Sequence, residues 1–366
     1  MDPIYRLPPW RIESILSASD LTQVIDWGLI AGGVPAAWQL SRGEGVTVAV
    51  LDTGVDREHA DLVTQFASDP ADFTGSPWGP DDRQGHGTHC AGIIAATDNA
   101  QGVVGVAPMA KLLVGKVLGD DGSGLGDWVA AGIDWARANK ADVISMSLGS
   151  PAPDPRIKAA IGRAVAAGVF VVTAAGNSGP HNADIDYPGR FDGTLAIASI
   201  NRDGNLSSFS SRGPQVDFAA PGEQILSTFP GGRYARLSGT SMATPFVAGI
   251  VALLISAHKK VGDQAMTPLK THEQLVEHLR RYARDAGPAG PDQGFGFGII
   301  SVDKLVEAEQ PPPPPPDDRK TLQLGPVTLH MPAAAGDRIG ATWPAALTDN
   351  DAAGGVIRAL SEAMTQ

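Results

Sequence analysis

Residues 48–54 read VAVLDTG, an apolar run that ends in an acidic residue and a glycine. The run starts at residue 46 and is rich in β-branched side chains, which is typical of a strand that is buried on both faces. Asp52 therefore stands at the carboxyl end of a predicted strand. Open α/β sheets build their sites at this end. The pattern indicates an α/β protein with Asp52 in a site at the edge of its sheet.

Two other segments carry the partners that such an acid needs in a hydrolytic site. Residues 85–89 read GHGTH and residues 238–245 read SGTSMATP, and each segment stands just before a helix-like apolar run. A serine hydroxyl is a weak nucleophile near neutral pH. It needs a base within hydrogen-bond reach and a carboxylate that orients this base. Ser241, His86 and Asp52 can supply these three groups.

A fourth segment offers a hydrogen-bond donor. Residues 169–175 read as a strand that runs into GNSG at 176–179. Acyl transfer needs donors aimed at the developing oxyanion, and the side-chain amide of Asn177 suits this role, with the backbone N–H of Ser241 as its partner. Each residue alone has an ordinary structural interpretation, such as a turn residue or a helix cap. Four such segments in one chain, each beside the element that its role requires, favour a catalytic site.

With these four segments the chain resembles the subtilisin-like serine proteases (subtilases), over about residues 20–308. The order acid, imidazole, hydroxyl is the one found in that group. The resemblance implies a serine endopeptidase with a three-layer αβα sandwich and a mostly parallel central sheet. The acid, imidazole and hydroxyl would form its catalytic triad, and Asn177 would be its oxyanion donor. Alternating strand-like and helix-like segments between residues 111 and 167 agree with parallel βαβ crossovers.

The resemblance also implies where protein or peptide substrates bind. Two extended segments would pair with the substrate backbone by β-augmentation, which grips any extended peptide. They consist of Gly122, Ser123 and Gly124, and of Ser147, Leu148 and Gly149. Asp186 is expected at the far end of the pocket for P1, the residue before the scissile bond, where a carboxylate favours Arg or Lys. The alternative is that Asp186 points to solvent. Gly126 stands where many relatives place an aromatic residue over the P4 pocket, so this pocket should be open.

Calcium is the cofactor that the resemblance implies. One Ca²⁺ would be held by a glutamine near the domain start, an acid after the catalytic acid, and a loop after the histidine helix. Oxygen-only ligation with many ligands suits this ion. The corresponding residues are Gln23, Asp61 and Asn99, with the backbone carbonyls of Thr97, Gln101 and Val103. The alternative is that Asp98 and Asn99 only cap a turn.

The first 22 residues form an extension ahead of the catalytic domain. Residues 7–10 (LPPW) resemble the Leu-Ile-Pro-Tyr/Phe-type segment of the intracellular subtilisins, with Pro8 at the position of the isoleucine. In that group the segment lies across the active site and blocks it. A proline has no N–H and a fixed φ, so it distorts a substrate-like strand. We therefore expect the extension to inhibit its own chain; a leader that packs elsewhere on the surface is the alternative.

The remaining organisation follows from composition. The catalytic domain is expected at residues 23–308, with a Gly-rich strand at 294–300 near its end. A Pro-rich linker follows at 309–318, where six consecutive prolines predict a stiff polyproline II spacer. The tail at 319–366 has few large apolar residues and is expected to be poorly ordered.

The formal net charge of −12 argues against nucleic acid and anionic membranes as partners. No apolar run reaches the length needed to span a bilayer, and the first ten residues lack the apolar region of a secretory signal. The single cysteine, Cys90, excludes an intramolecular disulfide framework. These features favour a cytoplasmic enzyme. A secreted degradative subtilase and a catalytically silent peptide-binding homologue are the alternatives. The oligomeric state stays open, with a homodimer among the alternatives.

Overall fold

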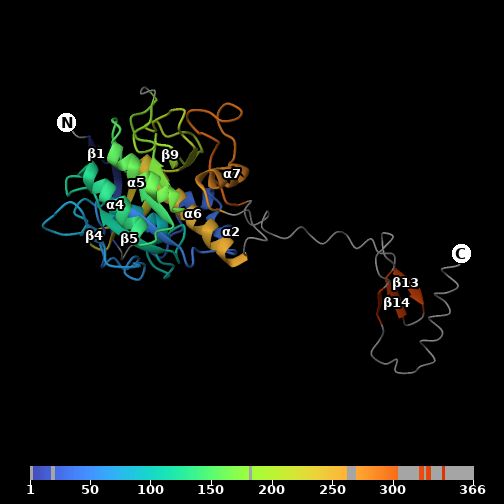
Figure 1. Ribbon diagram of the computed structural model, residues 1–366. Helices are drawn as coiled ribbons and strands as arrows, with labels where there is room; N and C mark the ends of the chain where they lie inside the picture. The colour runs from blue at the N-terminus through green and yellow to red at the C-terminus, as the bar shows by residue number, and fades with distance from the viewer. Residues whose placement is uncertain are drawn as a thin grey trace. The chain divides into compact units, whose positions relative to one another are not determined.

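The computed structural model describes residues 3–17, 21–180, 184–261 and 269–303, and three short strands beyond residue 320. The chain forms two compact units, Met1–Glu309 and Gln310–Gln366 (Figure 1). The described part of the second unit is an antiparallel sheet of β13 (Thr321–Leu324), β14 (Val327–His330) and β15 (Gly340–Thr342). The expected proline linker and most of the tail lie outside the described residues.

A seven-stranded parallel sheet forms the centre of the first unit, in the order β10-β9-β8-β7-β3-β5-β4. Its longer strands are buried almost throughout, which explains their apolar, β-branched sequences. The strands are β3 (Thr47–Asp52), β4 (Ala71–Asp72), β5 (Lys111–Lys116), β7 (Val143–Met146), β8 (Phe170–Ala174), β9 (Thr194–Ile200) and β10 (Phe218–Pro221).

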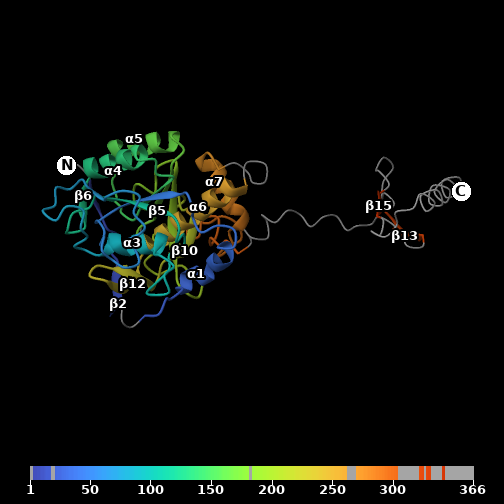
Figure 2. The ribbon, with the colours of Figure 1, turned by 90° about the horizontal axis from the view of Figure 1, so that it is seen from below.

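Helices cover both faces of this sheet (Figure 2). Val48 and Val50 of β3 pack in one apolar cluster with α3 and α6, whereas Ala49 and Leu51 pack in another with α4 and α5. This alternation follows from the two-residue period of a strand. The expected three-layer α/β sandwich is confirmed. The helices are α1 (Trp27–Ala31), α2 (Val34–Ala37), α3 (His86–Ala95), α4 (Gly126–Ala138), α5 (Pro155–Ala166), α6 (Thr240–Val261) and α7 (His272–Tyr282).

Helix α6 corrects one expectation from the sequence. An 18-residue window of its stretch Thr240–Lys260 has a mean hydropathy of 1.8, and the stretch is long and apolar enough, by length and composition alone, to cross a membrane. The expectation that no apolar run reaches this length is therefore wrong. The apolar window of this stretch is completely buried inside the protein. Its length and composition therefore suit a central core helix equally well.

Two small antiparallel sheets contain strands from the N-terminal extension. β1 (Ile4–Arg6) pairs with β6 (Ser123–Leu125). β2 (Arg11–Ser17) forms the outer strand of a sheet with β12 (Arg233–Ser238) and β11 (Ile225–Phe229). The extension is therefore part of the first unit.

The prediction of a Gly-rich strand at 294–300 is wrong. Ile299 makes isolated bridges with Ala219 and Arg284, but no strand forms. Gly296 and Gly298 have φ values of +61° and +123°. These left-handed conformations turn the chain out of an extended path, and glycine adopts them without a steric penalty.

Candidate active site

The four residues predicted for catalysis lie at the ends of core elements. Asp52 is the last residue of β3, and His86 is the first residue of α3. Ser241 lies in the first turn of α6, and Asn177 follows the end of β8. All four are buried in the folded chain. Because parallel strands end at the same edge of the sheet, these side chains converge there.

Asp52 and His86 form a buried pair. The Nδ1 atom of His86 lies 2.8 Å from Oδ1 of Asp52, and the same oxygen accepts a 2.8 Å hydrogen bond from the backbone N–H of Thr53. Burial opposes the charged form of the imidazole, but the Asp52 carboxylate outweighs this effect and raises the pKa of His86 well above its usual value. The carboxylate therefore orients the ring and stabilises its protonated form.

The glycines that flank His86 permit this approach. Gly85 has a φ of +98°, and a Cβ atom built there would lie 2.3 Å from the Phe229 ring. A Cβ atom at Gly87 would lie 2.2 Å from the carbonyl oxygen of Gly54. Since real side chains do not tolerate such distances, only glycine lets α3 begin this close to the end of β3. This accounts for the GHG pattern of the sequence.

The Ser241 hydroxyl does not complete the triad geometry in this structure. Its Oγ atom lies 3.5 Å from the carbonyl oxygen of Ser147, and Nε2 of His86 has no hydrogen-bond partner among the described residues. The Trp10 ring lies against His86 instead, with ring centroids 5.5 Å apart. The acid–imidazole pair is thus assembled, while the Ser241 hydroxyl makes no hydrogen bond to His86.

Asn177 presents its amide N–H₂ group to a peptide carbonyl. Its Oδ1 atom accepts hydrogen bonds from the backbone N–H and the hydroxyl of Thr240, at 2.9 Å and 2.8 Å. These two bonds fix the orientation of the amide. The Nδ2 atom donates a 2.8 Å hydrogen bond to the carbonyl oxygen of Pro9, a residue of the N-terminal extension. A side-chain donor that follows β8 is therefore fixed in place and aimed at a peptide carbonyl of the extension.

The N-terminal extension occupies both segments predicted for substrate binding. Arg6 exchanges two backbone hydrogen bonds with Gly149, of 2.9 Å and 2.8 Å, and the N–H of Leu7 donates to the carbonyl of Gly122 at 3.1 Å. Strand β1 also pairs with Ser123 and Gly124 through its ladder with β6. The two segments therefore hold an extended chain between them.

The other two predicted binding residues have internal roles. Ser147 donates its hydroxyl to the carbonyl of Ser241 at 2.9 Å, and Leu148 is buried in the core. Tyr5 is a residue that the sequence analysis missed. Its side chain is completely buried in the same apolar cluster as Leu148, and this burial raises the pKa of its hydroxyl. No local sequence pattern around Tyr5 indicates this burial.

The side chain of Asp186 lies between Gly149 and Gly176. Cβ atoms built at Gly149 and Gly176 would lie 2.9 Å and 2.7 Å from atoms of the Asp186 side chain. The backbone N–H of Asp186 donates to the carbonyl of Ala175 at 3.0 Å. Burial raises the pKa of the Asp186 carboxyl, and the nearby Arg190 opposes this shift. Within the described ranges, no donor makes a hydrogen bond to this carboxylate.

The structure brings the six residues predicted for calcium around one loop. Asp61 is completely buried, and its carboxylate accepts hydrogen bonds from the Asn99 amide, the backbone N–H of Val103 and the Tyr234 hydroxyl, at 2.9 to 3.0 Å. These donors are all neutral. The backbone N–H of Thr97 donates to the carbonyl of Asp61 at 2.9 Å.

Gln23 reaches the same loop from the start of the domain. Its side chain donates to the carbonyl of Thr97 at 3.3 Å and accepts from the backbone N–H of Ala100 at 3.0 Å. The backbone N–H of Gln101 donates to the side-chain oxygen of Asn99 at 3.0 Å. One buried carboxylate, two amide oxygens and several carbonyls are therefore gathered in one place. This oxygen-only donor set fits calcium.

His89 has a packing role. Its Nε2 atom lies 3.1 Å and 3.0 Å from the carbonyl oxygens of Ile225 and Ala235, and burial lowers its pKa to about 3. A neutral imidazole therefore links α3 to the sheet of β11 and β12.

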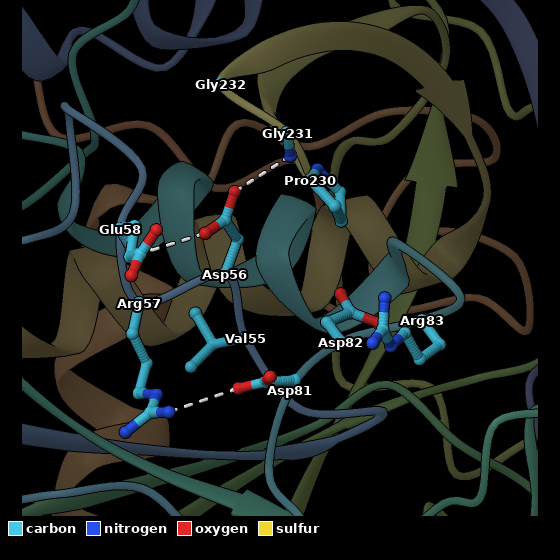
Figure 3. A pocket seen from close by; sticks show the side chains of 10 residues that line it. All are labelled: Val55, Asp56, Arg57, Glu58, Asp81, Asp82, Arg83, Pro230, Gly231 and Gly232. Carbon is cyan, nitrogen blue, oxygen red and sulfur yellow. Dashed lines mark hydrogen bonds and ion pairs between the residues drawn. The ribbon is translucent and has the colours of Figure 1, made fainter. Parts of the chain in front are cut away.

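A polar hollow of about 660 Å³ lies between the segments at 55–58 and 81–83 and the turn at 230–232 (Figure 3). Asp56 accepts a 2.8 Å hydrogen bond from the N–H of Gly231, and Arg57 pairs with Asp81 at 3.3 Å. None of the predicted site residues lines this hollow, which is bounded by Val55, Asp56, Arg57, Glu58, Asp81, Asp82, Arg83, Pro230, Gly231 and Gly232.

Comparison with known proteins agrees with this geometry. A family model described as the subtilase family matches residues 43–298. The chain is 46% identical to the intracellular serine protease of Paenibacillus polymyxa over 249 residues, which cover 66% of this chain and 76% of that protein. It is 39% identical to the major intracellular serine protease of Bacillus subtilis over 308 residues, 81% and 94% of the two chains. Subtilisin E of Bacillus subtilis is 40% identical over 294 residues, 79% and 73% of the two chains.

Proposed function

The chain belongs to the subtilase family and is a serine endopeptidase, and on this premise we propose which residues carry its chemistry and how that chemistry is restrained. Asp52, His86 and Ser241 are the triad, and Asn177 is the oxyanion donor. The N-terminal extension inhibits the enzyme until it is removed. The single observation that carries the proposal is the hydrogen bond from Asn177 to the carbonyl of Pro9, because it combines an oxyanion-type donor with a peptide bound in the cleft.

In the proposed mechanism, the Ser241 hydroxyl attacks the carbonyl carbon of the scissile bond while Nε2 of His86 takes the hydroxyl proton. Asp52 holds Nδ1 of His86 and stabilises the imidazolium, in agreement with the raised pKa of this histidine. The oxyanion of the tetrahedral intermediate binds to the Asn177 amide and the Ser241 backbone N–H. His86 then gives the proton to the leaving amine, and water hydrolyses the acyl-enzyme by the same steps.

Three features support inhibition by the extension. The backbone hydrogen bonds of Arg6 and Leu7 imitate those of a substrate. Pro8 and Pro9 have no N–H to continue this ladder. Trp10 covers the His86 ring, and the Ser241 hydroxyl faces a backbone carbonyl instead of the base. A bound peptide in this state lies in the cleft without an activated nucleophile.

Calcium is the proposed cofactor. The buried Asp61 carboxylate, whose donors are all neutral, leaves a negative charge that a cation can offset. When bound, Ca²⁺ would tie the loop after α3 to the start of the domain and stabilise the fold. The residues proposed to hold it are Gln23, Asp61, Thr97, Asn99, Gln101 and Val103.

We also propose a bias toward Arg or Lys at P1. Asp186 packs against Gly149 and Gly176, two walls of the proposed pocket. A basic side chain can lay its apolar stem along these walls and pair its head group with the carboxylate. For the setting we propose the cytoplasm, which is supported by the names of two relatives as intracellular serine proteases.

Labelling with a fluorophosphonate tests the proposed nucleophile. The full-length chain should acquire one covalent adduct on Ser241 after the extension has been released, and Ser241→Ala should acquire none. Peptide mapping by mass spectrometry locates the adduct. A catalytically silent peptide-binding homologue would show no adduct in either protein, whatever the state of the extension.

A further inference from the structure

Among the described residues, one edge of strand β12 is covered only by β2 of the N-terminal extension. We propose that this edge is a binding strand for substrates, and that it holds about seven residues on the carboxyl side of the scissile bond as an added β-strand. The proposal rests on the proposed inhibition by the extension, because β2 must leave before a substrate can bind there.

The path of the extension supports this role. The carbonyl of Pro9 lies on Asn177, and the next residue, Trp10, lies on His86. Arg11 then pairs with Ser238, three residues before Ser241. A substrate whose scissile carbonyl takes the place of the Pro9 carbonyl would therefore enter β12 directly, in the same direction.

The register gives the length of this surface. Strand β2 pairs with every residue of β12, from Arg11 opposite Ser238 to Ser17 opposite Arg233. Seven extended residues span about 23 Å. The register shifts between Arg236 and Leu237, and this bulge leaves Glu13 without a partner in the ladder. The surface therefore extends well beyond the residues next to the scissile bond.

Strand β2 is held mainly by its backbone. Ile12 and Ile15 expose 49% and 45% of their surface, so they contribute little apolar burial. Backbone hydrogen bonds are available to any extended peptide, and a free strand edge accepts a new strand readily. A different peptide can therefore replace β2 without loss of a specific apolar contact at these two positions.

One side chain of β2 does enter an apolar cluster. Leu16 packs against a group of buried residues that includes Leu226 and Tyr234, and Tyr234 is its partner across the strand pair. Leu16 is the seventh residue after Pro9 in the sequence. We therefore expect a preference for an apolar residue at the seventh position after the scissile bond. The partner class is an unfolded or extended protein segment with at least seven residues beyond that bond.

Internally quenched peptides test the proposal on the full-length enzyme, after any initial lag has ended. All peptides share the residues up to the first one after the scissile bond. The long peptide has eight residues after the scissile bond, with Leu at the seventh position after the bond. The short peptide has two residues after the bond. We expect kcat/KM to be about tenfold or more higher for the long peptide, because several added backbone hydrogen bonds each contribute.

Two matched sets of the long peptide separate strand pairing from length alone. In both sets N-methylation is confined to the fifth to eighth residues after the bond, which lie beyond the bulge at Glu13; the even residues are methylated in one set and the odd ones in the other. Since alternate N–H groups of a strand face its neighbour, only one set should lose the advantage of the long peptide. Replacement of Leu by Asp at the seventh position should lower kcat/KM severalfold, whereas Asp at the sixth position should not.

Equal kcat/KM values for the short and long peptides, or equal losses in both N-methylated sets, would overturn the β12 proposal. Neither result would affect the proposed inhibition, which is judged by the lag itself. A full-length enzyme with no lag and no processing would instead contradict that inhibition, and the β12 proposal would fall with it.

Discussion

The Nδ2 atom of Asn177 donates a 2.8 Å hydrogen bond to the carbonyl oxygen of Pro9. Asn177 stands at the end of a core strand, whereas Pro9 belongs to a leader that is 168 residues away in sequence. The amide is fixed from behind by Thr240, so its donor direction does not depend on the leader. A preformed donor of this kind favours a developing oxyanion over a neutral carbonyl. The same contact therefore links the proposed chemistry of the site to its proposed inhibition.

The oxyanion role predicts a specific kinetic effect. Asn177→Ala should lower kcat of the activated enzyme by about 10²–10³, the size typical of a subtilisin-type oxyanion donor, with little change in KM. Ser178→Ala is the matched control, because Ser178 follows Asn177 in the chain and its side chain is exposed.

Ser241→Ala and His86→Ala should each abolish peptidase activity. Steady-state kinetics on one peptide substrate measures all four variants; near-wild-type turnover of Ser241→Ala would rule out the triad assignment.

The proposed inhibition by the N-terminal extension, the leader, gives a separate prediction. Deletion of residues 1–18 should raise the initial kcat/KM and remove any lag in progress curves. Tyr5→Ala should weaken the hold of the leader and shorten the lag, because Tyr5 is completely buried, whereas Ile4→Ala should not, because Ile4 is 47% exposed. Progress curves with mass spectrometry of the products measure both effects. Identical initial rates for full-length and deleted proteins would show that the leader does not inhibit.

Calcium removal should destabilise the fold. A ligand that binds only the folded state at 100 times its Kd stabilises by about 2.7 kcal/mol, so chelation should lower Tm and speed autolysis. Asp61→Ala should lower Tm in the same way and lose most of the response to EDTA. Asp98→Ala is the control from the same loop, because Asp98 is an exposed partner of Arg42 and not a proposed ligand. A Tm that is independent of EDTA in the wild-type protein would exclude the site.

The position of Cys90 beside His86 predicts that mercurials inhibit the enzyme. Its Sγ atom lies 3.7 Å from Nδ1 of His86 and 3.5 Å from the carbonyl oxygen of Ser241, and burial raises the pKa of the thiol. We therefore expect the thiol to have no catalytic role, and a bulky adduct on it to displace His86. We expect Cys90→Ala to keep its activity and to resist mercurials that inhibit the wild type. Activity assays with and without the mercurial test this; outright loss of activity in Cys90→Ala would contradict it.

The sequence predicted the core better than it predicted the state of the site. Asp52, His86 and Asn177 were found because each lies beside a strand or helix with a strong local pattern, and the glycines beside His86 have a steric cause that is visible in sequence. The rotation of the Ser241 hydroxyl toward Ser147 and the burial of Tyr5 depend on contacts between distant segments. No local pattern encodes them. The wrong strand at 294–300 has the same origin, since glycines at positive φ bend a run that otherwise looks extended.

The final prediction concerns specificity at P1. Asp186→Asn should lower the Lys/Phe ratio of kcat/KM by roughly a factor of five, because a partly screened ion pair contributes about 1 kcal/mol. Asp184→Asn is the matched control, since this carboxylate is 53% exposed and pairs with Arg190.

Burial raises the pKa of Asp186, so the carboxylate becomes protonated at a higher pH than an ordinary aspartate. The preference for Lys should therefore decline as pH falls, and this decline should begin at a higher pH than the usual aspartate pKa would suggest. In Asp186→Asn the ratio should not depend on pH over that range. Matched P1 Lys and Phe substrates, assayed on the three proteins across acid pH, measure the effect. A Lys/Phe ratio that is the same in wild type and Asp186→Asn at every pH would show that Asp186 does not set this preference.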